Sequence, residues 1–85
     1  MEYVVVAFRA RSETVAFSNF LVKYGISNRI VNTPKEAGVG CGLSVKINKE
    51  QFFTVKRAVF SFNAKSFAGF FSVKTLNGKN MVHSI

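Results

Sequence analysis

The strongest constraint on the fold of this chain is an unbroken apolar segment near its start. Residues 3–9 read Tyr-Val-Val-Val-Ala-Phe-Arg, with no polar residue between the tyrosine and the arginine. A continuous run that is rich in β-branched residues is typical of a strand covered on both faces. Because a chain of 85 residues has room for one core, we expect residues 3–9 to form the central strand of a single sheet.

Two segments have the periodicity of amphipathic helices. The first begins at Ser12, which we expect to cap its N-terminus, and it ends at Gly25. The second follows Asn48, which is also a residue type favoured at N-caps. The apolar stripes of the two segments are formed by Phe17, Phe20, Leu21 and Tyr24 and by Phe52, Val55, Val59 and Phe62. Each segment therefore predicts a helix with one face on the core.

Three further segments predict strands. Residues 26–33 alternate loosely and stop at Pro34, which has no N–H to donate and disfavours helix in the residue before it. Residues 43–47 alternate apolar and polar side chains, as a half-buried strand does. Residues 66–74 have the composition of a last core strand.

The predicted elements follow the order β-α-β-β-α-β, which is the split β-α-β arrangement of ferredoxin-like folds. We therefore predict an α+β domain over residues 1–74, with an antiparallel sheet and two helices on one face. Residues 75–85 form a tail, in which the type I′ turn sequence Asn77-Gly78 could fold residues 80–83 back as a short extra strand. With right-handed crossovers, the third strand starts at the same end of the sheet as the end of the first strand and the start of the first helix.

Charge and cysteine content limit the classes of function. Twelve Lys and Arg against four Asp and Glu give a net charge of +8, which attracts acidic proteins, anions or nucleic acid without selecting among them. One cysteine and one histidine allow no internal disulfide and too few ligands for a metal site built from this chain alone. No segment has the length of a membrane span, and Glu2 is unlike the start of a signal peptide. We therefore expect a cytoplasmic protein with no membrane partner.

The most distinctive residue is Cys41, in the sequence Gly38-Val39-Gly40-Cys41-Gly42. Alternating glycines allow positive φ values and leave backbone N–H groups uncovered for an anionic sulfur. The predicted topology also brings cations and a helix N-terminus to the thiol, and these favour the nucleophilic thiolate. The supporting residues are Arg9, Arg11, Ser12, Pro34 and Lys35, whereas Glu13 and Glu36 oppose them. The alternative is a buried Cys41 that serves only as a small core residue.

Two other patterns point to less specific functions. Residues 65–73 resemble the glycine-aromatic strand of an RNA-recognition module, but they form the fourth strand instead of the third, and their phenylalanines suit a core. His83 lies in the tail, which gives little support to a Cys–His nucleophile pair. The sequence contains no phosphate-binding loop or dinucleotide fingerprint and points to neither a cofactor nor a turnover enzyme.

At residues 30–36 (Ile-Val-Asn-Thr-Pro-Lys-Glu) and 41–46 (Cys-Gly-Leu-Ser-Val-Lys), the chain resembles the small Se/S carrier-like proteins. In this family a strand ends in a Pro-Thr-Pro-Arg-like segment, a few small residues follow, and an apolar strand begins after Cys-Gly. The resemblance covers roughly residues 3–73, the extent of a single domain. It departs from the family pattern at Asn32, where a proline is usual, and at Val39-Gly40, where small or hydroxyl residues are usual.

The resemblance implies a carrier that holds sulfur or selenium on Cys41 and passes it from a protein donor to a protein acceptor. Such a protein is a carrier more than an enzyme. The alternative, from a different class, is a non-catalytic module that binds RNA or an acidic protein through its basic surface, with Cys41 structural. A homodimer is compatible with both hypotheses. The two hypotheses differ in where they place the Cys41 sulfur: exposed in a cleft, or packed among the phenylalanines.

Overall fold

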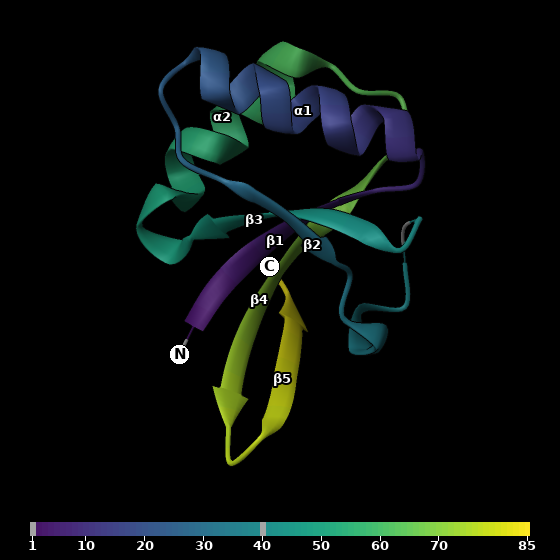
Figure 1. Cartoon of the computed structure of the whole chain (residues 1–85), viewed down its shortest axis with the longest axis vertical. Helices are drawn as coiled ribbons and strands as arrows, with labels where there is room; N and C mark the ends of the chain where they lie inside the picture. The colour runs from purple at the N-terminus through teal and green to yellow at the C-terminus, as the bar shows by residue number, and fades with distance from the viewer. Residues whose placement is uncertain (1, 40) are drawn as a thin grey trace.

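The computed structural model describes residues 2–39 and 41–85, which form one sheet with two α-helices (Figure 1). The elements in chain order are β1 (Glu2–Phe8), α1 (Arg11–Lys23), β2 (Arg29–Asn32), β3 (Leu43–Asn48), α2 (Phe52–Phe62), β4 (Phe67–Leu76) and β5 (Lys79–Ser84). Two short 3-10 turns, η1 (Lys35–Ala37) and η2 (Lys49–Gln51), precede β3 and α2.

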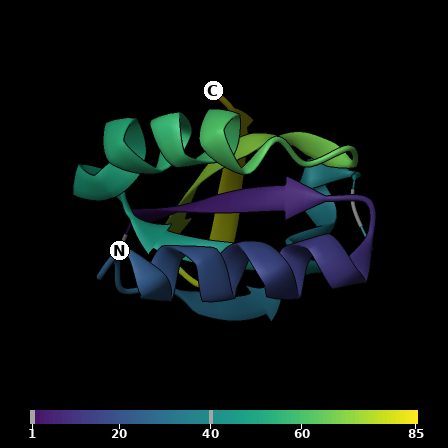
Figure 2. The same cartoon turned by 90° about the horizontal axis from the view of Figure 1, so that it is seen from above.

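The strands lie in the order β2-β3-β1-β4-β5, and each neighbouring pair is antiparallel. The first four strands have the order of a ferredoxin-like sheet, with β1 in the centre. Both helices cover the same face of the sheet (Figure 1), and the view from above shows them side by side across β1 (Figure 2). The predicted α+β fold class is therefore confirmed.

The core has two layers because β1 buries both of its faces. On the helical face, alternate β1 residues Val4, Val6 and Phe8 pack with α1, α2 and the helix-facing residues of β3 and β4. On the other face, Val5 and Ala7 pack with Phe71 and Val73 of β4. Ala37 and Val39 of the connector and Val82 of β5 cover part of this second layer. The apolar run of β1 is thus unbroken because both faces of this strand are buried, as its pattern predicted.

The C-terminal segment forms the predicted extra strand. Asn77 and Gly78 both have positive φ values, 52° and 76°, as a type I′ turn requires at its two central positions. β5 then pairs with β4 over six register positions, from Leu76 opposite Lys79 to Phe71 opposite Ser84. His83 is exposed on this strand. The domain boundary after residue 74 remains a prediction, and β4 continues across it.

The N-cap prediction at Ser12 is wrong. α1 begins one residue earlier, at Arg11, and Ala10 is its N-cap without a side-chain hydrogen bond. The start of the helix is held instead by Ser66, whose Oγ accepts a hydrogen bond from the Ala10 N–H at 3.0 Å. Ser12 is exposed in the first turn. The hydrogen bond that a local capping residue was expected to make is thus made by a residue 56 positions away in sequence.

β2 is also shorter than predicted, because the residues before it are hydrogen-bonded to α1. The Ile26 N–H donates to the Leu21 carbonyl at 2.9 Å, and the Asn28 side chain donates to the Ser18 carbonyl at 3.2 Å. These bonds hold the segment against the helix, so that strand pairing begins only at Arg29.

Glu13 links α1 to the start of β4 and gives the fold a pH dependence. Its carboxylate accepts hydrogen bonds from the Ser66 hydroxyl and from the Lys65 and Ser66 N–H groups, and these bonds hold the pKa of Glu13 below its ordinary value. A carboxyl whose pKa is lower in the folded than in the unfolded state stabilises the fold at neutral pH. This stabilisation is lost as the pH falls through the lowered pKa.

We therefore expect Glu13→Gln to flatten the acid limb of the stability curve. The measurement is the free energy of unfolding in urea, from about pH 7 to about pH 3, for wild type and variant. The exposed Glu50 provides a control, as Glu50→Gln. An acid limb of unchanged steepness in the Glu13 variant would contradict the role of this carboxylate.

Candidate functional site

Thr33 closes the loop that carries the cysteine. Its N–H donates to the Gly42 carbonyl at 2.9 Å, and its hydroxyl lies 2.7 Å from that of Ser44, which is fully buried at the start of β3. Pro34 follows as the N-cap of η1, with a φ of −57° that suits its ring. Thr33 therefore joins the end of β2 to the start of β3, and Pro34 begins the loop between these two strands.

Two of the loop glycines are needed for their backbone conformation. Gly38 ends η1 in the left-handed region at φ 67°, and Gly42 has a φ of 93°. An added Cβ would meet no atom within 4 Å at either position, so lack of space does not explain these glycines. A residue with a side chain would be strained there by its φ alone. Gly40 lies outside the described residues.

The Cys41 thiol is held at the junction of three elements. The Cys41 N–H donates to the carbonyl of Phe8, the last residue of β1, at 3.2 Å. Its Sγ is 3.6 Å from the Leu43 carbonyl, to which the thiol donates, and 3.8 Å from Oγ1 of Thr14 in the first turn of α1. The side chain is half-buried. The start of β3 thus lies beside the end of β1 and the start of α1, as the topology predicts.

Thr14 is the residue at this site that sequence reasoning missed. It is fully buried, and its hydroxyl also lies 3.4 Å from the Ala10 carbonyl and 3.5 Å from the Leu43 carbonyl. Its position carries a signal, because Thr14, Phe17 and Leu21 form one buried stripe with spacings of three and four residues. Thr14 is a polar residue on this buried stripe, and it lies in the first turn of a helix whose start faces the cysteine. Such a position indicates a side chain directed at the site.

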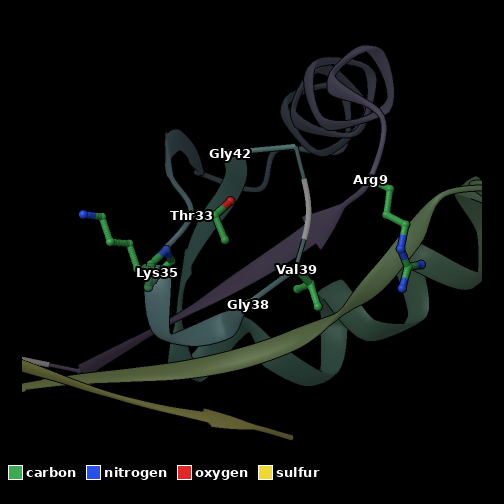
Figure 3. Close-up of a pocket in the computed structure, with 7 residues that line it drawn as sticks. Arg9, Thr33, Lys35, Gly38, Val39 and Gly42 are labelled. Atoms are coloured by element: carbon green, nitrogen blue, oxygen red, sulfur yellow. The ribbon is translucent and has the colours of Figure 1, made fainter.

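Five of the predicted supporting residues, Arg9, Pro34, Lys35, Gly38 and Gly42, line an open hollow of about 580 Å³. Thr33 and Val39 line it as well. Val39 belongs to the apolar layer on the sheet face opposite the helices, whereas the Cys41 sulfur contacts α1. Figure 3 shows the Lys35 side chain extending away from Arg9 and Val39, so the two cations do not point at one another. Arg11 and Ser12 are exposed in the first turn of α1.

The described part of the chain was also searched for features of metal, membrane and RNA binding. Among residues 2–39 and 41–85, no group of three or more His, Cys, Asp or Glu side chains is placed to hold a metal ion. No helix in the same residues is long and apolar enough to span a membrane. Phe70 and Phe71, in the strand that resembles an RNA-binding strand, are each 7% exposed and face opposite core layers, so they present no surface for base stacking.

Comparison with known proteins gives one match. The family model described as "Putative Se/S carrier protein-like" matches residues 3–66, three quarters of the chain. The matched segment runs from β1 through α2 and includes the Thr-Pro turn, Cys41 and Thr14. Searches of curated proteins and of solved structures return no significant match.

Proposed function

Because the chain belongs to the Se/S carrier protein-like family, we propose that it carries sulfur or selenium as a persulfide or selenopersulfide on Cys41. The observation that supports this most is the environment of the sulfur. Cys41 is half-buried against Thr14 and the Leu43 carbonyl, and among the described residues it belongs to neither apolar layer of the core. A cysteine that served only as packing is expected inside the core.

The transfer step needs no external redox partner. The Cys41 thiolate attacks the outer sulfur of a persulfide on the donor protein, the donor's S–S bond breaks, and a new S–S bond forms on Cys41. The donor cysteine leaves as a thiolate and takes the electron pair of the broken bond. The outer sulfur keeps its oxidation state. Delivery to an acceptor thiolate is the same exchange, with Cys41 as the leaving group.

The partners in this proposal are a donor and an acceptor protein, and the exchange takes place in the cytoplasm, where thiols are kept reduced. The net charge of +8 favours acidic surfaces on both partners. Exposed Arg9, Arg11 and Lys35 lie at the end of the sheet that carries Cys41 and would steer such surfaces toward it.

Intact mass spectrometry tests the proposal directly. Protein isolated from cells without reductant is expected to contain a fraction that is heavier by one sulfur or one selenium atom, and a thiol reductant should remove the added mass. Which of the two atoms is present follows from the size of the increment. Protein that never carries such an increment, even after incubation with a low-molecular-weight persulfide, would contradict the carrier function.

Thr14 should accelerate the reactions of the sulfur. A thiolate only accepts hydrogen bonds, so it no longer donates to the Leu43 carbonyl, and the Thr14 hydroxyl can turn from that carbonyl toward the charged sulfur. We expect Thr14→Val to slow alkylation of Cys41 by iodoacetamide about ten-fold near neutral pH, because a hydrogen bond to a charged group is lost. Thr14→Ser keeps the hydroxyl and should restore most of the rate. Equal rates in the wild type and the valine variant would show that the contact has no chemical role.

A further inference from the structure

Helix α2 carries large apolar side chains on two opposite sides. Val55 and Val59 face the core and are 0% and 8% exposed, whereas Phe53 and Phe60 are 73% and 77% exposed. These are the two largest exposed fractions among the exposed large apolar residues of the described chain. The two phenylalanines are seven residues apart, which is two helical turns, so both rings lie on the same side of the helix. A helix with apolar residues on both sides is expected to have a partner on both sides, and the fold covers only one of them.

The charges between the two exposed rings are positive. Lys56 and Arg57 occupy the intervening turn, three or four residues from each phenylalanine, and both are exposed. We call Phe53, Lys56, Arg57 and Phe60 the α2 stripe. α2 itself contains no acidic residue, and Glu50 of the preceding turn is the nearest one in sequence. Within the described residues, no carboxylate lies within 4 Å of either cation, so both charges are available to a partner.

A hollow of about 330 Å³ lies beside Phe60, between α2 and the start of β4. It is lined by Lys56, Val59, Phe60, Asn63, Ala64, Phe67 and Phe70. The Phe67 and Phe70 rings lie 5.0 Å apart, and both belong to the packing around the helix-covered core layer. The Lys56 ammonium lies 5.9 Å from the Phe52 ring, which packs 5.2 Å from Phe70, so this charge is at the side of α2 that borders the hollow. The hollow therefore offers an apolar floor with a cation beside it.

We infer that the α2 stripe and this hollow bind an amphipathic helix of a partner protein whose apolar face is flanked by acidic residues. The rings of Phe53 and Phe60 are about 10 Å apart along the axis of α2, which matches apolar residues two turns apart on a second helix. One apolar side chain of the partner would enter the hollow, and its carboxylates would pair with Lys56 and Arg57. This inference goes beyond the proposed chemistry at Cys41 and does not depend on it.

Two other occupants match the surface less well. A second copy of this chain would meet the α2 stripe with its own α2 stripe in a two-fold contact, which brings Lys56 and Arg57 against the same cations of the other copy. An anionic membrane would match the cations and the exposed rings, but it has no protruding side chain that fills the hollow. An acidic helix satisfies the charges, the rings and the hollow together.

Titration with a designed peptide tests the surface. The probe is a helical peptide of about 20 residues with leucines along one face and glutamates along the other. Amide NMR shifts are expected to change at residues 53–60 and at 63–70. Phe60→Ser should weaken binding about ten-fold or more, because it removes an aromatic anchor at the centre of the contact. Val22→Ser is the matched control, because Val22 is 64% exposed on α1, and it should bind the peptide as wild type does.

Two double variants test the contribution of charge. Lys56→Gln with Arg57→Gln should weaken peptide binding and reduce its dependence on salt. Lys74→Gln with Lys79→Gln makes the same change in net charge on the exposed β4–β5 hairpin and should have a much smaller effect. Weakening of equal size in the two double variants would overturn the inference, as would equal binding of a peptide with lysines in place of the glutamates.

The site of binding and the class of partner are tested in the same titrations. Failure of the glutamate peptide to bind, or shift changes centred on α1 instead of α2, would overturn the inference. Vesicles of anionic phospholipid provide the membrane test. Vesicles that bind through Phe53 and Phe60 while the peptide does not would overturn the inference in favour of a membrane surface. Dimerisation of the protein alone that Phe60→Ser abolishes would overturn it in favour of a second copy.

Discussion

In a Cys41→Ser variant, the added mass of a sulfur or selenium atom is expected to disappear completely from protein isolated without reductant. Cys41 is the one cysteine of the sequence, so no second thiol can take its place. The hydroxyl of serine is a far weaker nucleophile at neutral pH and forms no stable bond of this kind. Loading by a low-molecular-weight persulfide, followed by intact mass spectrometry, should likewise show no reaction. An increment that persisted in the serine variant would place the chalcogen elsewhere.

A relocated cysteine tests whether the rate of sulfur transfer depends on the surroundings of Cys41 or only on the presence of a thiol. In the double variant Cys41→Ser with Ser61→Cys, the thiol lies at an exposed position of α2. It has the same net charge and the same number of thiols as wild type, but it lacks the Thr14 and Leu43 contacts. We expect it to accept sulfur from the persulfide at a clearly lower rate than wild type. Equal rates would show that the loop contributes nothing beyond a thiol.

Replacing Phe8 with alanine is expected to cost a large share of the stability of the domain. Phe8 is fully buried, and its ring lies 5.3 Å from Phe17, 6.3 Å from Phe62 and 5.9 Å from Phe67, centroid to centroid. Removal of a buried phenylalanine ring costs about 3–5 kcal/mol. A domain of 85 residues has a total stability on the order of 4–13 kcal/mol. The measurement is the free energy of unfolding in urea.

Phe53 provides the matched control, because it is 73% exposed on α2. Phe53→Ala should change the free energy of unfolding by about 0.5 kcal/mol or less. If the two variants were destabilised equally, the cluster of aromatic rings would not be the centre of the fold.

The sheet and both helices could be predicted from the sequence because their signals are local. Residues 3–9 show a strand buried on both faces, and the stripe from Phe52 to Phe62 shows which face of α2 is apolar. The turn at Asn77-Gly78 also follows from residue types alone, since both must adopt positive φ. Each of these features is encoded within about ten neighbouring residues.

What sequence reasoning missed depends on contacts between distant residues. The start of α1 is fixed by Ser66, and the sulfur of Cys41 is met by Thr14. The topology correctly predicts that the loop before β3 comes to the start of α1, but it does not say toward which sheet face each side chain turns. For that reason Arg9 and Lys35, which were expected around the sulfur, instead line a hollow whose Val39 packs on the opposite face.

The central position of β1 affects how the chain can fold during synthesis. This strand is synthesised before both of its partners, β3 and β4, which begin only at Leu43 and Phe67. Its valines therefore stay unpaired while the segment between β1 and β3 is being translated, and native β1 pairing cannot be completed until β4 has left the ribosome. Pairing between such distant segments is slow. Until then, the nascent chain exposes a short apolar segment with unpaired strand edges, which is the kind of surface that chaperones shield.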